Sequence, residues 1–159
     1  MSWENAETGM DLILWRHADA EDGTPDSTRK LTDKGEKQAQ QMAQWLKARL
    51  PEKYSVLVSP AKRAQQTAQA LSKTFDTVKA LEPGADAISI LSAAGWPAAR
   101  GTVVVVGHQP TLARVAAFLL AGEEEDWSMK KGSIWWLSNR VRQGEGQTVL
   151  RVMMTPEFV

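Results

Sequence analysis

The chain alternates short apolar runs with longer segments whose apolar residues recur every three or four positions. The runs at 11–15 and 102–106 carry no polar alternation, which is typical of buried strands that are covered on both faces. The segments between such runs show helical spacing. The elements expected from this pattern are strands at 11–15, 54–58, 77–80, 102–106, 133–138 and 148–154, and helices at 33–49, 60–73, 85–95 and 110–121.

Helix boundaries follow from capping residues. Thr32 is suited to cap the first helix, and Pro51 ends it. Ser59 and Pro60 form a start signal for the second helix, with Ser as the N-cap and Pro in the first helical position. Between the first strand and the first helix, residues 18–31 are rich in loop-forming residues, and a loop of that length in a compact domain is often functional.

The alternation of strands and helices predicts an α/β fold. We expect a three-layer α/β/α arrangement around a mostly parallel central sheet of about five to six strands. The run 102–106 should be a central strand, and the last two strands should form an antiparallel edge. Residues 1–10 are expected to be a flexible leader, followed by a single domain over 11–159.

Composition narrows the possible functions. The 159 residues include two His and no Cys, and 19 basic residues balance 19 acidic ones. The absence of Cys excludes a disulfide scaffold, a thiol nucleophile and Cys-ligated metal centres. The charge balance gives no support for nucleic-acid binding. No apolar run approaches the roughly 20 residues that a membrane span needs, and the polar start is unlike a signal peptide, so we expect a cytoplasmic protein.

Three of the expected strands are followed directly by a pair of residues that includes a polar side chain. These pairs are Arg16-His17, Ser59-Pro60 and Gly107-His108. In open α/β sheets ligands bind beyond the carboxyl ends of the strands, which places both histidines of the chain at one candidate site. Arg16 and Arg63 would add guanidinium groups suited to phosphoryl or carboxylate oxygens, and the helix starts near 60 and 110 would add backbone donors.

This combination favours chemistry on an anion. A neutral His can attack phosphorus and form a phosphohistidine intermediate, while cationic groups stabilise the charge on the transferred group. Each of these residues and segments also has a purely structural interpretation. A single His is more often structural than catalytic, an Arg in a first helical turn is usually solvated, and the GHQP segment is compatible with a simple turn.

Four segments together resemble the histidine phosphatase superfamily, also described as phosphoglycerate mutase-like. They are LILWRHADA, LTDKGEKQA, VLVSPAKRAQQTA and VVVVGHQPTL, in that order. The resemblance covers about residues 11–121. The family's Arg-His-Gly motif is here Arg16-His17-Ala18, and Ala enters positive φ less freely than Gly. The short chain and the RHADA and LEPGAD segments are most similar to the SixA-like branch, the small phosphohistidine phosphatases.

The resemblance implies roles for individual residues. His17 corresponds to the nucleophile, and Arg16, Arg63 and His108 correspond to groups that contact the phosphate. Arg29, in DSTRKLT, resembles a further basic phosphate-binding position of that branch. Asp26 would then orient Arg29.

A general acid is less clearly indicated. Larger members of the superfamily use a separate Glu or Asp to protonate an alkoxide, and the candidates here are Glu82, Asp86 and Asp19. Each of them is equally compatible with a solvated carboxylate, and Asp86 with a helix cap. A phosphoramidate needs less acid assistance than an ester, because its leaving imidazole is far less basic than an alkoxide.

The resulting functional hypothesis is a phosphatase that removes phosphate from a protein phosphohistidine, such as one on a histidine phosphotransfer domain in signal transduction. His17 would be neutral and His108 protonated, so activity should fall at low pH and again at higher pH. No metal or cofactor is expected, and inorganic phosphate or sulfate would fit the site. The alternatives are a small-molecule phosphomonoesterase of the same superfamily and an inactive phosphoprotein-binding module.

Overall fold

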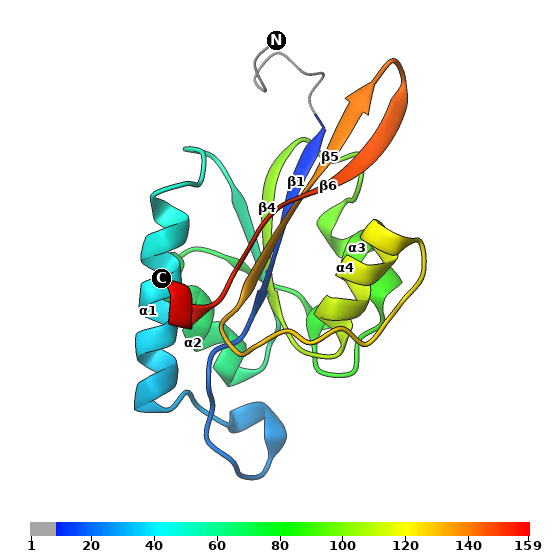
Figure 1. Ribbon diagram of the computed structural model, residues 1–159. Coiled ribbons are helices and arrows are strands. Elements are labelled where there is room, and N and C mark those ends of the chain that lie inside the picture. The colour runs from blue at the N-terminus through cyan, green and yellow to red at the C-terminus, as the bar shows by residue number, and fades with distance from the viewer. Residues whose placement is uncertain (1–8) are drawn as a thin grey trace.

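A computed structural model describes residues 9–159, so most of the expected leader lies outside the described residues. Figure 1 shows the arrangement of its elements. In chain order they are β1 (Met10–Arg16), η2 (Asp26–Thr28), α1 (Asp33–Lys47), β2 (Ser55–Val58), α2 (Lys62–Leu71), β3 (Asp76–Thr77), η3 (Lys79–Leu81), α3 (Ala87–Ala94), β4 (Gly101–Gly107), α4 (Thr111–Ala121), β5 (Ile134–Arg142), β6 (Glu145–Met154) and η4 (Pro156–Phe158). Within these residues no helix is long and apolar enough to cross a membrane.

The sheet has six strands in the order β3-β2-β4-β1-β5-β6. The pairs β3–β2, β2–β4 and β4–β1 are parallel, whereas β1–β5 and β5–β6 are antiparallel. The prediction of a mostly parallel sheet with an antiparallel edge is therefore confirmed, as is the position of the strand over 102–106 inside the sheet.

The two faces of the sheet carry separate cores. Leu12, Leu14 and Val105 pack with α3 and α4 on one face, while Ile13 and Trp15 pack with α1 and α2 on the other. Figure 1 shows these helix pairs on opposite sides of the sheet. Because both faces are covered, β1 and β4 need apolar residues at successive positions, which explains their lack of alternation.

Three elements differ from the prediction. The strand expected at 77–80 covers only Asp76–Thr77, and Lys79–Leu81 forms the short helix η3 instead. The second helix begins at Lys62 instead of residue 60, and its N-cap is Ala61, which offers no side-chain cap. The Ser59 hydroxyl accepts a hydrogen bond from the Ala61 amide at 3.2 Å and has a second partner in the candidate site. The final hairpin is also longer than expected, because pairing continues to its tip and leaves a turn at Gln143 and Gly144, both with positive φ.

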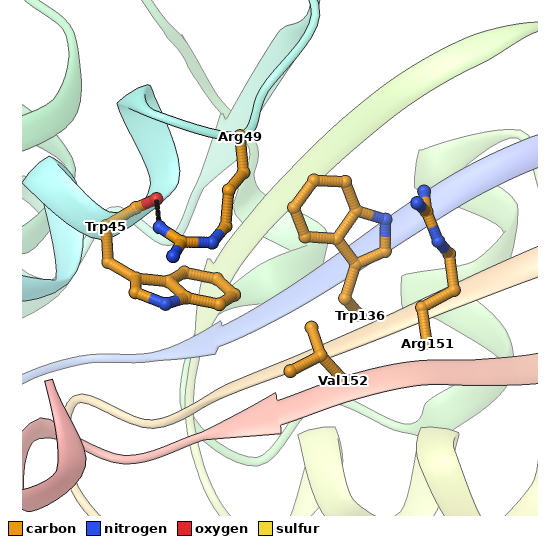
Figure 2. Close-up of a pocket in the computed structure, with 5 residues that line it drawn as sticks. All are labelled: Trp45, Arg49, Trp136, Arg151 and Val152. Atoms are coloured by element: carbon orange, nitrogen blue, oxygen red, sulfur yellow. Dashed lines mark hydrogen bonds between the residues drawn. The ribbon is translucent and has the colours of Figure 1, made fainter.

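A hollow of about 360 Å³ lies between the end of α1 and the edge strands (Figure 2). The Trp45 and Trp136 rings meet edge to face with centroids 6.4 Å apart. The Arg49 guanidinium lies 4.4 Å from the Trp45 centroid, and that of Arg151 lies 5.1 Å from the Trp136 centroid. Arg151 and the Trp136 ring N–H both bind Asp11, near the start of β1. The hollow is therefore remote from the carboxyl end of that strand.

Asp11 is expected to stabilise the fold through this edge. Its carboxylate accepts hydrogen bonds from Trp136 Nε1 at 3.0 Å, from Ser138 Oγ, and from Arg151 Nη1 at 2.8 Å. Asp11→Ala should lower the free energy of unfolding by about 2–3 kcal/mol, because it removes the acceptor of the buried Trp136 and Ser138 donors. Urea denaturation would measure the change. The exposed Asp22 provides the control, and an equal effect of Asp22→Ala would contradict this role of Asp11.

Candidate functional site

Both histidines lie together at the carboxyl edge of the parallel strands. Arg16 pairs with Gly107 at the ends of β1 and β4, so His17 and His108 leave the sheet side by side. Their ring centroids are 5.2 Å apart with an interplanar angle of 53°. Both side chains are buried, with 7% and 4% of their surface exposed. The structure therefore brings together the two residues that the strand positions predicted to meet.

The hydrogen bonds of His17 define which ring nitrogen can react. Its Nδ1 lies 2.7 Å from the carbonyl oxygen of Ala18, an acceptor, so Nδ1 carries the proton. Nε2 is left with its lone pair, toward which Arg63 Nε–H donates at 3.3 Å. The main chain of His17 is held by bonds from its N–H to Gly107 and from the Gly132 N–H to its carbonyl. The ring is therefore fixed in one orientation.

Burial is the main cause that lowers the pKa of His17, to about 4. The nearby charges of Arg63, Arg16 and Arg29 lower it further, against the opposing effect of the Ala18 carbonyl. At neutral pH His17 is consequently an uncharged imidazole with an available lone pair on Nε2, as expected from the sequence. The rate of any reaction that needs this lone pair should therefore fall as the pH drops through about 4.

Ala18 is accommodated without backbone strain in place of the usual Gly. Among the described residues other than Gly, positive φ occurs only at Gln143. Ala18 is fully buried and packs with Leu31 and Ala39. Its N–H donates to Thr67 Oγ1 at 3.0 Å, and the Thr67 hydroxyl donates to the Arg63 carbonyl. No role in the site was predicted for Thr67, so its link between α2 and the His17 loop was missed.

Arg63 is a buried cation bound on three nitrogens. Besides the Nε contact with His17, its Nη1 donates to the Asp26 carbonyl at 2.9 Å and its Nη2 to the Asp26 carboxylate at 3.1 Å. Arg29 Nε donates to the other Asp26 oxygen at 3.1 Å. Asp26 thus bridges the two arginines, whereas the sequence connected it with Arg29 alone.

The Arg16 side chain is the second guanidinium near the histidines. Its Nη1 donates to the Met129 carbonyl at 2.7 Å, and its buried Nε has no hydrogen-bond partner within the described part of the chain. Burial and the charge of Arg63 lower the pKa of Arg16 from its ordinary value. The site therefore holds two guanidinium groups close enough for their charges to interact.

His108 has a partner that sequence reasoning missed. Its Nε2 lies 2.7 Å from the fully buried Ser59 hydroxyl oxygen. The Ser59 O–H has no other acceptor among the described residues, so it donates to Nε2, while the Ser59 oxygen accepts from the Ala61 amide. Nδ1 of His108 then carries the proton, and it is buried without a partner among the described residues. The clue in the sequence was the position of Ser59 directly after a strand at the same edge.

The prediction of a protonated His108 is wrong for the site without a bound anion. Burial, followed by the charges of His17 and Arg63, lowers the pKa of His108 to about 3. The ring is therefore neutral at pH 7 and offers a single N–H donor. Burial depth cannot be derived from motif spacing, which is why the sequence suggested an ordinary titrating imidazole.

Neither the three candidate acids nor Asp26 makes a hydrogen bond to either histidine within the described residues. Asp86 caps α3 through Ser89 N–H at 2.7 Å, as its helix-cap interpretation proposed, and Glu82 is exposed. Asp19 accepts from Thr32 at 2.7 Å and pairs with Lys131 at 3.0 Å. Burial raises the pKa of Asp26, but its bonds to Arg63 and Arg29 outweigh this and hold the pKa below its usual range.

The lowered pKa values of the two histidines predict weaker stability in acid. In the unfolded chain the histidines bind protons near pH 6.5. In the folded chain His17 stays neutral down to about pH 4 and His108 down to about pH 3. The free energy of unfolding should therefore fall by about 2 kcal/mol per histidine between about pH 7 and pH 5. Urea unfolding of the wild type and of a His17→Asn/His108→Asn variant would measure it. Equal slopes of stability against pH in both proteins would contradict the burial effect.

The arrangement is suited to holding an oxyanion against a nucleophile. It combines a lone pair on His17, guanidinium groups from Arg16 and Arg63, and an unpartnered buried donor on His108. In the described residues, no group of three or more His, Cys, Asp or Glu side chains could hold a metal ion. The charges of Arg16 and Arg63 act on both histidines.

Comparisons with known proteins agree with this geometry. Residues 12–88 match the histidine phosphatase superfamily, branch 1. The chain is 34% identical over 124 residues to phosphohistidine phosphatase SixA of Escherichia coli strain K12, covering 72% of this chain and 76% of that protein. The solved structure of the protein histidine phosphatase SixA complexed with tungstate superposes with a TM-score of 0.77 at 26% identity, covering 94% of this chain and 99% of that one.

A second solved structure gives the same result. The putative phosphohistidine phosphatase SixA from Nakamurella multipartitia superposes with a TM-score of 0.78 at 27% identity, covering 96% of this chain and 99% of that one. The structural likeness extends well beyond the segment that matches the family in sequence.

Proposed function

The chain belongs to the histidine phosphatase superfamily and is a phosphatase, and on that premise we propose that it removes the phosphoryl group from a phosphohistidine of a protein. The observation that carries this proposal is the pairing of the His17 Nε2 lone pair with the buried Arg63 guanidinium, 3.3 Å away. The similarity to phosphohistidine phosphatase SixA supports the substrate class. A histidine phosphotransfer domain is the kind of partner that would present such a group.

In the first step, Nε2 of His17 attacks phosphorus in line with the bond to the leaving nitrogen. Arg63 Nε–H, which donates to Nε2 in the resting site, transfers its hydrogen bond to a phosphoryl oxygen as the lone pair is used. The Arg16 Nε–H and the His108 Nδ1–H bind the remaining oxygens. Both N–H groups are buried and have no other partner among the described residues. The developing charge is thus met by donors that are already in position.

The leaving group explains why no acid is required. As the bond from phosphorus to the substrate imidazole breaks, its electron pair returns to the ring nitrogen. The ring departs as a neutral imidazole when its other nitrogen carries a proton. An alkoxide would need a proton from the enzyme, and Glu82, Asp86, Asp19 and Asp26 have no hydrogen bond to either histidine in the described part of the chain. The site therefore suits a phosphoramidate better than an ester.

In the second step, water attacks the phosphorus of phospho-His17. The bond from phosphorus to Nε2 breaks, its electrons return to Nε2, and inorganic phosphate leaves with the oxygen and protons of the water. The bond from Nδ1–H to the Ala18 carbonyl keeps the ring in the same tautomer and orientation throughout. His17 is thereby regenerated as a neutral nucleophile.

The proposal includes metal-independent catalysis. We expect phosphate release from a phosphorylated histidine phosphotransfer domain to persist after treatment with a chelator, because arginine side chains supply the positive charge. Activity that is lost with the chelator and restored by a divalent cation would contradict this part. A cytoplasmic location stays a prediction of the sequence.

Substrate preference is the test that separates the candidate functions. Purified protein is incubated with a phosphohistidine protein, p-nitrophenyl phosphate and a set of sugar phosphates, beside His17→Asn as the inactive control. We expect kcat/KM to be highest for the phosphohistidine protein. Preference for a small ester would favour the phosphomonoesterase instead, and release of phosphate from none would favour the inactive binding module.

A further inference from the structure

Helix α2 holds the loop after His17 through one face. Arg63, Gln66 and Thr67 occupy positions i, i+3 and i+4, which are neighbours on a helix surface. Thr67 accepts from the Ala18 N–H, and Gln66 accepts from the Leu31 N–H at 2.7 Å. These two contacts fix both ends of the 18–31 loop, and Arg63 contacts its middle through Asp26. The helix and the loop therefore form one unit around the candidate nucleophile.

Within that loop Asp26 is held from both sides. It begins the short η2 turn, and one carboxylate oxygen accepts from Arg29, whose Nη1 donates to the Glu21 carbonyl at 3.2 Å. The base of the loop is closed by the bond from the Glu21 N–H to the Lys30 carbonyl at 2.8 Å. The second carboxylate oxygen and the main-chain carbonyl of Asp26 are thereby presented together to Arg63.

We infer that Asp26 is a positioning residue, which clamps the two terminal nitrogens of Arg63 so that its Nε–H is aimed at His17 Nε2. This inference rests on the proposed role of His17 as the nucleophile. A guanidinium is planar, so fixing Nη1 and Nη2 also fixes the direction of Nε–H. Arg63 is 4% exposed, and the Asp26 carboxylate compensates the cost of burying its charge beside Arg16 and Arg29.

The clamp leaves Arg63 able to serve the substrate. Of the five N–H groups of a guanidinium, Asp26 takes one on each terminal nitrogen, and the Nε–H faces His17. One N–H on each terminal nitrogen is thus available for a phosphoryl oxygen. Asp26 acts through Arg63, and it is expected to influence the rate of phosphoryl transfer without itself contacting the transferred group.

The Nε–H signal of Arg63 in ¹H–¹⁵N spectra reports the clamp without requiring any activity. The signal is assigned by its disappearance in Arg63→Lys. We compare wild type, Asp26→Ala, Asp26→Asn and Asp22→Ala, the last being an exposed carboxylate in the same loop. Asp26→Ala should broaden or remove the signal, Asp26→Asn should weaken it less because one oxygen acceptor remains, and Asp22→Ala should leave it unchanged.

Kinetics with a phosphohistidine protein complete the test. Asp26→Ala should lower kcat by about 10- to 100-fold, with KM changed about twofold at most, because misdirecting one group affects the transition state more than binding. The inference would be overturned if Asp26→Ala retained the Arg63 signal, or if it lost the signal with kcat unchanged. Equal losses of signal and of kcat in Asp22→Ala would also overturn it. If the wild type released no phosphate, the proposed function would fail, while the NMR comparison would still decide whether the clamp exists.

Discussion

His17→Asn is expected to lower kcat for a phosphohistidine protein by about 10⁴-fold or more, because it removes the group that forms the covalent bond to phosphorus. Asn retains a polar side chain of similar reach, but its amide has no nucleophilic lone pair comparable with Nε2. The His17 ring is held by the Ala18 carbonyl with Nε2 facing Arg63, whereas Nε2 of the neighbouring His108 is bound by the Ser59 hydroxyl. Stopped-flow or discontinuous phosphate-release assays would measure the change.

His108→Asn is the matched control for this experiment. It removes the other histidine of the chain, which is equally buried but is proposed only to donate a hydrogen bond. Its loss should be about 10²- to 10³-fold in kcat, typical for one donor to a developing charge. A His17→Asn protein that retains activity comparable with His108→Asn would contradict the assignment of His17 as the nucleophile.

Arg63→Ala is expected to lower kcat/KM by about 10³-fold, because the variant loses both a phosphoryl-binding guanidinium and the partner of the His17 lone pair. Arg63→Lys should recover only part of this loss. Lysine keeps the charge but cannot reproduce the planar set of donors that reaches His17 and Asp26 together. Steady-state kinetics with a phosphohistidine protein would give both values.

The neighbouring Lys62 supplies the control for charge alone. It lies in the same helix turn and is exposed, so Lys62→Ala removes one cation without touching the site. Its activity should match that of the wild type. Full activity in Arg63→Lys would show that charge without geometry is sufficient, and the planar guanidinium would then have no special role.

Much of the fold follows from the sequence because its signals are local. The β-branched run 102–106 lies inside the sheet with both faces covered, as its lack of alternation predicted. Thr32 caps α1 through the Gly35 amide at 3.0 Å, as expected. Ser59 is the instructive exception, because its hydroxyl bonds to His108, 49 residues away, and the chain enters α2 two residues later than the local signal indicated.

The sequence predicted most residues of the candidate site but few of the hydrogen bonds between them. His17, His108 and Arg63 meet as the strand ends implied, since parallel neighbouring strands end at one edge. The bridge from Asp26 to Arg63 depends on how the 18–31 loop folds back over α2, which no local pattern specifies. The neutral state of His108 depends on burial by the whole assembly, so a motif alone could not reveal it.

Trapping the phosphorylated protein tests the role of His17 as the nucleophile most directly. The enzyme is mixed with a ³²P-labelled phosphohistidine protein, quenched in alkali, digested, and its phosphopeptides are identified by mass spectrometry. The chain has two histidines, so an acid-labile label has two candidate positions. We expect one phosphoryl group on the peptide that contains His17, retained in His108→Asn and absent in His17→Asn. A label on His108, or turnover with no trapped phosphohistidine in the wild type, would contradict a covalent phospho-His17 intermediate.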